Sequence, residues 1–315
     1  MSKDLIPPAF GSQGLGSGLG VGLGNSSAAL SSGFGVGPGS QPVDEDGMEL
    51  DYMEMPREMA TFDPPIAPEP EDTTGMIAGK AKLEELLVAL NAYKVGGAKG
   101  KVDISELTST DLGLINQILG EGEVSIVCGS NIQAQESVLA GVWRVLTHDD
   151  NGALIRDEIE VADYPACVEQ AVFAEAQTSV GDVDAQLPPG IFNAPSLISE
   201  LQDKQGNYKS GDVVHSINLT LLPQTEEDLA YLDNKLGKGK VVILSRGYGN
   251  CRVSSTGTKN IWWVQYYNSQ DAIILNSIEV IDVPDVVCAA QEDIEDSAER
   301  LEEILVIYRD GGETQ

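Results

Sequence analysis

The chain has 315 residues and a formal net charge of −31, from 50 acidic and 19 basic residues. Such an acidic surface repels phosphate backbones and anionic lipids, so composition argues against nucleic acid and membranes as partners and favours a basic protein or peptide. The length accommodates two modest domains, and no apolar run approaches the ~18 residues that would predict a membrane span.

The first part of the chain has the composition of a tail. Residues 1–54 are rich in Gly and Ser and then acidic, which predicts disorder, and 55–75 form a Pro-rich segment. Met1 leads into Pro7 and Pro8 with no apolar stretch typical of a signal peptide, so we expect a cytoplasmic protein without membrane insertion.

A first folded unit is predicted over 76–180. Leucines at helical spacing indicate a helix over 81–94, and a second helix is expected over 109–119, ending at Gly120. A strand should follow at 122–127, then a helical or looped stretch over 133–140 and a strand over 141–147. After a turn at 150–152 come another strand and a helix that begins at Pro165.

A linker with one short helix, Pro195 to Asp203, is predicted over 181–210, and a second unit over 211–310. This unit begins with an alternating strand over 213–222. Thr225 should cap a helix, with Asp228 at the capping-box position. The strand 241–245 is followed by an irregular stretch to Lys259, two further strands and a long C-terminal helix.

The two units are related in sequence. Residues 110–168 reappear as 227–287, with an offset of 117 at Asp111/Asp228, 120 at Trp143/Trp263 and 119 at Pro165/Pro284. Internal similarity at so steady a spacing indicates a duplication. The predicted fold is therefore α+β, with two tandem helix-strand-strand-strand-helix units and mainly antiparallel sheets.

Catalytic and nucleotide-binding patterns are missing from the sequence. The Gly-rich tail has no GxGxxG, and the GKGK at 237–240 lies between a helix and a strand, the reverse of a phosphate loop. The two histidines, His148 and His215, have no accompanying nucleophile motif. We therefore expect no enzymatic activity, no catalytic residues and no cofactor.

The four cysteines show no CxxC pairing and do not fall at equivalent places in the two units. Small buried thiols explain most of them. Cys251 differs because its sequence neighbours are Gly, Asn and Arg; it is a weak candidate for metal binding or reactivity, together with Cys288.

A partner-contact surface is the positive prediction. The segment 246–259 combines Arg, Tyr and Gly in a predicted exposed loop, and Tyr and Arg are typical interface anchors. The segment 131–144 is its counterpart in the first unit. The candidate partner-binding residues are Arg246, Tyr248, Asn250, Arg252, Lys259, Gln135, Glu136 and Arg144.

Several long motifs resemble one family. The run from Leu244 to Ile304, the blocks ILGEGEVSIV and QESVLAGVWRV within 118–145, and the Pro-rich segment 55–72 are similar to the HupH/HyaF hydrogenase expression/formation proteins. Together these stretches cover most of residues 55–305, while the Gly-rich stretch 11–40 falls outside the resemblance.

The resemblance implies a non-enzymatic accessory protein, or chaperone, in the maturation of a membrane-bound uptake [NiFe] hydrogenase. It implies action in the cytoplasm before export, with the iron–sulfur small-subunit precursor, which carries a twin-arginine signal, as the expected partner. Other hydrogenase accessory proteins are further expected partners. The alternative is a carrier of iron–sulfur or iron–ligand cargo that uses Cys251.

Overall fold

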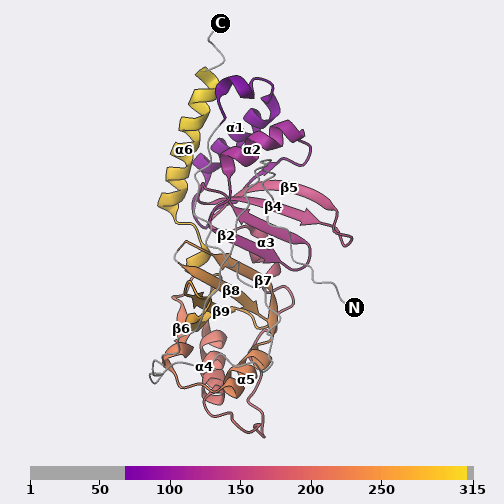
Figure 1. Ribbon diagram of the computed structural model, residues 1–315. Helices are drawn as coiled ribbons and strands as arrows, with labels where there is room; N and C mark the ends of the chain where they lie inside the picture. The colour runs from indigo at the N-terminus through magenta and orange to yellow at the C-terminus, as the bar shows by residue number, and fades with distance from the viewer. Residues whose placement is uncertain (1–67, 248, 311–315) are drawn as a thin grey trace, which may run out of the picture. The chain divides into compact units, whose positions relative to one another are not determined.

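The computed structural model describes residues 68–247 and 249–310, which belong to one compact unit that begins at Met59. These residues form an α+β fold in which one antiparallel sheet carries helices (Figure 1). The predicted tail over 1–54 and most of the Pro-rich segment lie outside the described residues.

The described residues contain six α-helices, three 3-10 helices and ten strands. The helices are η1 (Pro70–Thr73), α1 (Ile77–Ala92), α2 (Ser109–Leu119), α3 (Ala166–Ala171), α4 (Ala194–Asn207), η2 (Leu219–Leu221), α5 (Glu226–Leu236), η3 (Asp285–Val287) and α6 (Gln291–Asp310). The strands are β1 (Gly100–Asp103), β2 (Val124–Cys128), β3 (Ile132–Glu136), β4 (Val142–His148), β5 (Leu154–Val161), β6 (His215–Asn218), β7 (Lys238–Ser245), β8 (Asn250–Thr256), β9 (Ile261–Tyr267) and β10 (Ile273–Val280).

All ten strands join one sheet in the order β1-β5-β4-β3-β2-β7-β8-β9-β10-β6. The antiparallel pair β2 and β7 connects the strands of the first half to those of the second, with Ile126 opposite Ile243. Each half therefore contributes five strands, in mirrored order about the β2–β7 seam.

The predicted three strands per unit are too few, for the same reason in both halves. The stretch over 133–140 begins as strand β3, and the predicted loop 246–259 is largely strand β8. In β8 the alternation of Cys251, Val253 and Ser255 with Arg252 and Ser254 is a strand pattern, which the Gly and Ser content obscured. Helix α4 confirms the prediction of a helix inside the segment 181–210.

The helices α2 and α5 begin with matching caps. Thr108 and Thr225 each accept a hydrogen bond from the backbone N–H three residues later, at Asp111 and Asp228. The predicted capping box is present at Thr225, whose own N–H donates to the Asp228 carboxylate. These side chains satisfy N–H groups that the first helical turn leaves without partners.

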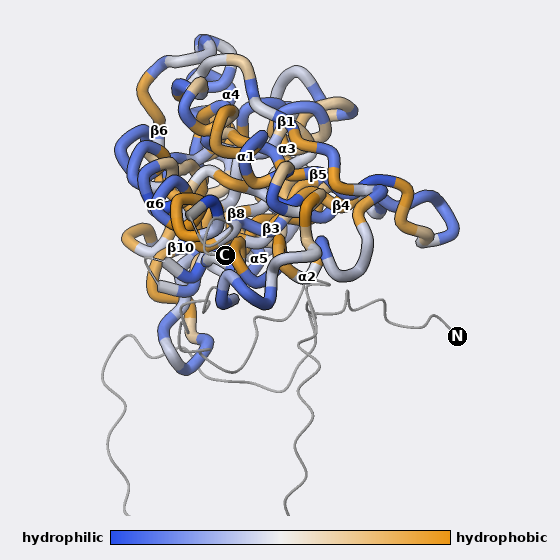
Figure 2. The backbone as a smooth tube through the Cα atoms, turned by 90° about the horizontal axis from the view of Figure 1, so that it is seen from above, coloured by the Kyte–Doolittle hydropathy of each residue, from blue (hydrophilic) through white to orange (hydrophobic). Residues whose placement is uncertain are grey.

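The hydrophobic core is divided between the two faces of the sheet. On one face, α1, α2 and α6 cover Val142 and Ile159, while α4 and α5 cover Ile261 and Ile278 at the other end. On the opposite face, α3 and η3 cover a third cluster built from the central strands. In Figure 2 the hydrophobic segments gather among the strands and inner helices, and the outer loops are mostly hydrophilic.

Helix α6 belongs by sequence to the second half but completes the core of the first. Its residues Ile294, Leu301 and Leu305 are buried against the leucines of α1 and α2. Tyr308 Oη donates to Pro68 O at 3.0 Å, and Lys94 pairs with Glu295 at 2.6 Å. The last described helix, α6, thus packs beside α1, near the start of the described chain (Figure 1).

The buried tryptophans correct one predicted correspondence. Trp143 and Trp262 are each the second residue of their strand and fully buried, and their Nε1 atoms donate to Ala162 O and Asp282 O at 2.9 and 3.0 Å. Trp263 instead lies half-buried on the other face. The counterpart of Trp143 is therefore Trp262, at an offset of 119 rather than 120.

The hairpin turns of the two halves also have the same design. Asp149 Oδ1 accepts hydrogen bonds from the N–H groups two and four residues later, and Asn268 Oδ1 does the same. Each turn contains a left-handed residue at the same place, Gly152 at φ 82° and Asp271 at φ 58°. Asp tolerates this conformation better than most side chains because it can bond the local backbone.

Candidate functional site

The sheet register places three of the eight predicted contact residues, Gln135, Arg144 and Arg252, in one line. Arg144 is opposite Gln135, Gln135 opposite Ser125, and Ser125 opposite Leu244 across the seam. Leu244 is in turn opposite Arg252, which is opposite Gln265. Directly paired residues project to the same face of a sheet, so these six form one row, the cross-sheet row.

The cross-sheet row lies on the face that carries the helices, in the gap between α2 and α5. Arg144 Nη1 donates to Asn116 Oδ1 of α2, which places the first helix pair on this face. Trp263, on the same side of β9 as Gln265, packs against the cluster formed with α4 and α5. Figure 1 shows the central strands β2, β7 and β8 between the two groups of helices.

This face is open over the central strands. Ser125, Val127, Gln133 and Val242 are only half-buried, whereas alternate residues on the other face are buried. Leu244 and Arg252 are the buried exceptions at the centre of the row. We call this surface, made by Ser125, Val127, Gln133, Gln135, Val242, Leu244, Asn250, Arg252 and Ser254, the open face.

Hydrogen bonds within the first half fix the polar groups of the row. Ser125 Oγ donates to Gln135 Oε1, and Gln135 Nε2 donates to the carbonyls of Gly122 and Val124 at 3.1 and 3.2 Å. Arg144 makes a two-point ion pair with Asp157, at 3.0 and 2.6 Å. Two-point pairing holds a guanidinium in a defined orientation. The row is therefore pre-arranged rather than mobile.

The second half places Asn250 and Arg252 two residues apart on the same side of β8. Burial raises the pKa of the Tyr267 phenol, and the charge of Arg252 beside it works in the opposite direction. Arg246 lies exposed at the end of β7, and its N–H donates to Glu123 O at 3.1 Å. Arg246 thus borders the open face.

Two other predicted residues, Lys259 and Glu136, do not join the surface. Lys259 lies beyond the opposite end of β8 from Asn250, where its N–H donates to Gln177 O at 2.9 Å. Glu136 pairs with Trp143 and therefore points to the opposite face. Tyr248 lies outside the described residues. The prediction of an exposed loop over 246–259 is wrong where β8 buries Cys251, Arg252 and Val253.

Glu136 has an unusual titration. Burial raises its pKa to about 7, and the nearby negative charges of Glu123 and Asp293 act in the same direction. A carboxyl in these surroundings is partly protonated at neutral pH.

The cysteine candidates are not placed for metal binding. Cys251 is buried among hydrophobic residues on the face opposite the row. The prediction that Cys251 differs from the other, buried cysteines is therefore wrong. Burial raises the pKa values of Cys251 and Cys288 to about 12, which disfavours the thiolate that binds metals. Among residues 68–247 and 249–310, no group of three or more His, Cys, Asp or Glu side chains could hold a metal ion.

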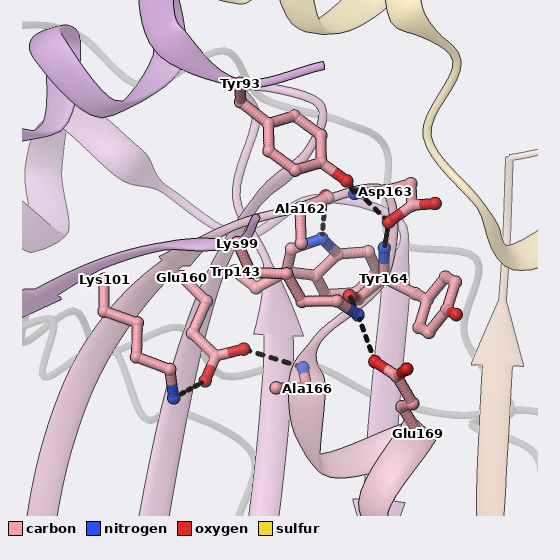
Figure 3. A network of polar contacts seen from close by, with 10 residues as sticks. All are labelled: Tyr93, Lys99, Lys101, Trp143, Glu160, Ala162, Asp163, Tyr164, Ala166 and Glu169. Carbon is pink, nitrogen blue, oxygen red and sulfur yellow. Dashed lines mark hydrogen bonds and ion pairs between the residues drawn. The ribbon is translucent and has the colours of Figure 1, made fainter. Parts of the chain in front are cut away.

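A polar network supports the sheet behind the row (Figure 3). Glu160 is buried; its carboxylate accepts from Lys101 Nζ at 2.6 Å and from the N–H of Ala166 at 2.8 Å. Asp163 accepts from Tyr93 Oη at 2.7 Å, and Lys99 pairs with Glu169 at 3.4 Å. These bonds tie α1, β1, β5 and α3 together.

Sequence reasoning missed six members of the open face, namely Ser125, Val127, Gln133, Val242, Leu244 and Ser254. The alternation of Gln133 and Gln135 with Ala134 was the available signal for β3, and the same alternation marks β8. The sequence does not indicate which strands are neighbours in the sheet, because the β2–β7 pairing joins residues more than a hundred positions apart.

The open face presents amide, hydroxyl and guanidinium groups at fixed positions beside short aliphatic side chains. Such groups bind the backbone and polar side chains of another protein. No helix within the described part of the chain has the length and apolar character to cross a bilayer. The fold and this surface define an acidic α+β protein with a half-buried hydrogen-bonding sheet face.

The chain belongs to the HupH hydrogenase expression protein family. The family model described as "HupH hydrogenase expression protein, C-terminal conserved region" matches residues 76–187 and again 191–308. The resemblance noted in the sequence is thereby confirmed.

Curated relatives extend over most of the chain. It is 47% identical over 271 residues to the hydrogenase expression/formation protein HupQ of Azotobacter chroococcum, which covers 85% of this chain and 94% of the relative. It is 43% identical to HupH of Rhodobacter capsulatus, with 86% and 95% covered, and 34% identical to the hydrogenase-1 operon protein HyaF of Escherichia coli, with 64% and 71% covered. A solved structure of HupH from Thiobacillus denitrificans aligns with 28% identity and a TM-score of 0.33, over 35% of this chain and 92% of that one.

Proposed function

We propose that this protein is a non-enzymatic accessory protein, or chaperone, in the maturation of a membrane-bound uptake [NiFe] hydrogenase. In this proposal it binds the iron–sulfur small-subunit precursor in the cytoplasm, before twin-arginine export, and contacts it through the open face. The observation that carries the proposal is family membership together with a pre-arranged, half-exposed polar sheet face.

The open face supports a binding role better than a catalytic one. Its side chains are mainly Ser, Gln, Asn and aliphatic residues, and its one arginine, Arg252, is buried. These groups recognise polar surface but supply neither a nucleophile nor a general base. Other hydrogenase accessory proteins are further partners in the proposal.

We also propose that the two halves arose by tandem duplication, with related units over 76–180 and 211–310, and that α4 of the segment 181–210 belongs to the second unit as the counterpart of α1. Three observations support this origin: the same order of elements in each half, the matched tryptophan and turn hydrogen bonds, and a family model that matches two consecutive segments. The strands that differ most in sequence between the halves, β3 and β8, flank the seam, with β3 beside β2 and β8 beside β7.

The test is co-purification of the full chain with an epitope-tagged hydrogenase small-subunit precursor, followed by a binding titration. Gln133→Arg and Ser254→Arg each place a long charged side chain on the open face without removing a core residue. We expect each to weaken binding by about tenfold or more, because a bulky, desolvated charge disrupts a complementary interface.

Gln270→Arg is the matched control, because Gln270 is exposed in the β9–β10 turn, away from the open face. It should bind as the unmodified protein does. Equal affinity for all three variants would exclude the open face, and failure of the unmodified chain to bind the precursor would refute the proposed partner.

A further inference from the structure

Two cysteines lie in direct contact on the buried side of the sheet. Cys128 ends β2 and Cys167 lies in the first turn of α3, and their Sγ atoms are 3.3 Å apart. Both side chains are almost fully buried, at 3% and 5% exposed. Neither belongs to the open face, and nothing in the proposed partner binding requires them.

The surroundings hold these two sulfur atoms together. Glu160, fixed by its ion pair with Lys101, accepts a hydrogen bond from the N–H of Ala166, the residue before Cys167 (Figure 3). This bond anchors the start of α3 against the sheet. Cys128 is held by the pairing of β2 with both β3 and β7, where it is opposite Ile132 and Val241.

We propose that Cys128 and Cys167 are a site of oxidative modification, which closes to a disulfide on exposure to a peroxide. One thiol reduces hydrogen peroxide to water and becomes a sulfenic acid. The second thiol attacks that sulfur and displaces a second water. Two thiols and one peroxide thus give one disulfide and two waters.

The disulfide would connect two regions that are held together only by non-covalent contacts in the reduced protein. Helix α3 starts the long connection between β5 and β6, and β2 is one of the two strands at the seam. A cross-link between them restricts the unfolded chain and therefore stabilises the folded one. Oxidation would join the start of this connection, at α3, covalently to the seam strand β2.

The reaction should be slow at neutral pH and faster in alkali. The hydrogen bond with Cys167, together with burial, raises the pKa of the Cys128 thiol, whereas the thiolate is the reactive form. Once a sulfenic acid has formed on either residue, the neighbouring sulfur is the nearest nucleophile.

The experiment treats the reduced full-length protein with hydrogen peroxide, blocks remaining thiols with N-ethylmaleimide in denaturant, and maps peptides by mass spectrometry without reduction. The expected product is a Cys128–Cys167 cross-link with the loss of two hydrogens, while Cys251 and Cys288 carry the blocking group. Thermal unfolding should shift upward by several degrees after oxidation and return on treatment with dithiothreitol.

Cys167→Ser is the matched variant, since it removes one sulfur and keeps a small side chain. It should lose the cross-link and the thermal shift, and Cys251→Ser should keep both. Blocked Cys128 and Cys167 after treatment of the folded protein would overturn the proposal. So would a cross-link that forms only when peroxide is added in urea.

Discussion

Asp111 and Asp228 hold the same structural position in the two halves, 117 residues apart, and each joins two helices. Asp111 Oδ1 accepts from the N–H of Gly79 at the start of α1, at 2.8 Å. Asp228 Oδ1 accepts from three consecutive N–H groups, those of Phe192, Asn193 and Ala194, each at 2.9 Å, at the start of α4. The Asp228 carboxylate also accepts from the N–H of Thr225 at the start of its own helix, whereas the Asp111 carboxylate accepts from the Thr108 hydroxyl.

Replacing these carboxylates should destabilise the protein, and more so at Asp228. Asp228→Ala leaves four backbone N–H groups without this acceptor in a buried place, so we expect a loss of about 2–4 kcal/mol in the free energy of unfolding. Asp111→Ala removes fewer bonds and should cost less. Urea unfolding followed by circular dichroism would measure both, and a smaller loss at Asp228 would contradict the argument.

The same two residues predict acid sensitivity. The Thr108 hydroxyl, and then the Gly79 N–H, lower the pKa of Asp111. Burial raises the pKa of Asp228, but bonds from the Ala194 and Phe192 N–H groups outweigh it and lower the pKa overall. Groups with a folded pKa below the unfolded value stabilise above about pH 4 and lose that effect as pH falls through the folded pKa. Unfolding measured below pH 4 should show smaller acid sensitivity in the Asp228→Ala variant.

Glu136 predicts the opposite trend at neutral pH. Its pKa of about 7 lies above the unfolded value of roughly 4.3, so its neutral form favours folding, and this effect disappears as pH rises through 7. Glu136→Gln should therefore flatten the decline in stability between pH 5 and 8, by about 1–3 kcal/mol at the upper end. Denaturant unfolding of both proteins at several pH values would check this, and parallel curves would refute it.

Gly141 should not tolerate a side chain. Its φ is 75°, and a Cβ there would lie 2.5 Å from Cγ1 of Ile294 on α6. Gly141→Ala adds backbone strain to a steric clash, so we expect a loss of about 1–3 kcal/mol. Gly152→Ala is the control: its φ is similarly positive, at 82°, but its Cβ would meet nothing within 4 Å. An equal loss in both variants would show that the contact with α6 is unimportant.

The buried tryptophans give a test of the corrected alignment. Trp143→Phe and Trp262→Phe each remove a buried indole N–H bond and leave a carbonyl unbonded, so both should lose stability by about 1–3 kcal/mol. Trp263→Phe should cost less because Trp263 is half-exposed. Thermal unfolding would rank the three variants, and a larger loss at Trp263 would restore the original alignment.

The sequence predicted the elements with strong local patterns and missed those defined by distant pairing. The α+β class, α1, α2, α5 and α6 follow from leucine spacing and caps, which act within a few residues. The strands β3 and β8 were missed because Gln, Ser and Arg occupy one side of each, and such strands resemble loops when their neighbours are unknown. Arg144 was predicted in the strand over 141–147 and Arg252 in the loop over 246–259; only the strand pairing across the β2–β7 seam places them in one row.

The position of helix α6 has a consequence for synthesis. The first core needs Ile294, Leu301 and Leu305, yet these are made only after all ten described strands of the sheet. The first core therefore cannot finish packing until α6 has been made, and a fragment that stops after β10 would expose the leucines of α1. A chain cut short before α6 should therefore be recognised as unfinished by proteases or chaperones, although all ten described strands of its sheet have already been made.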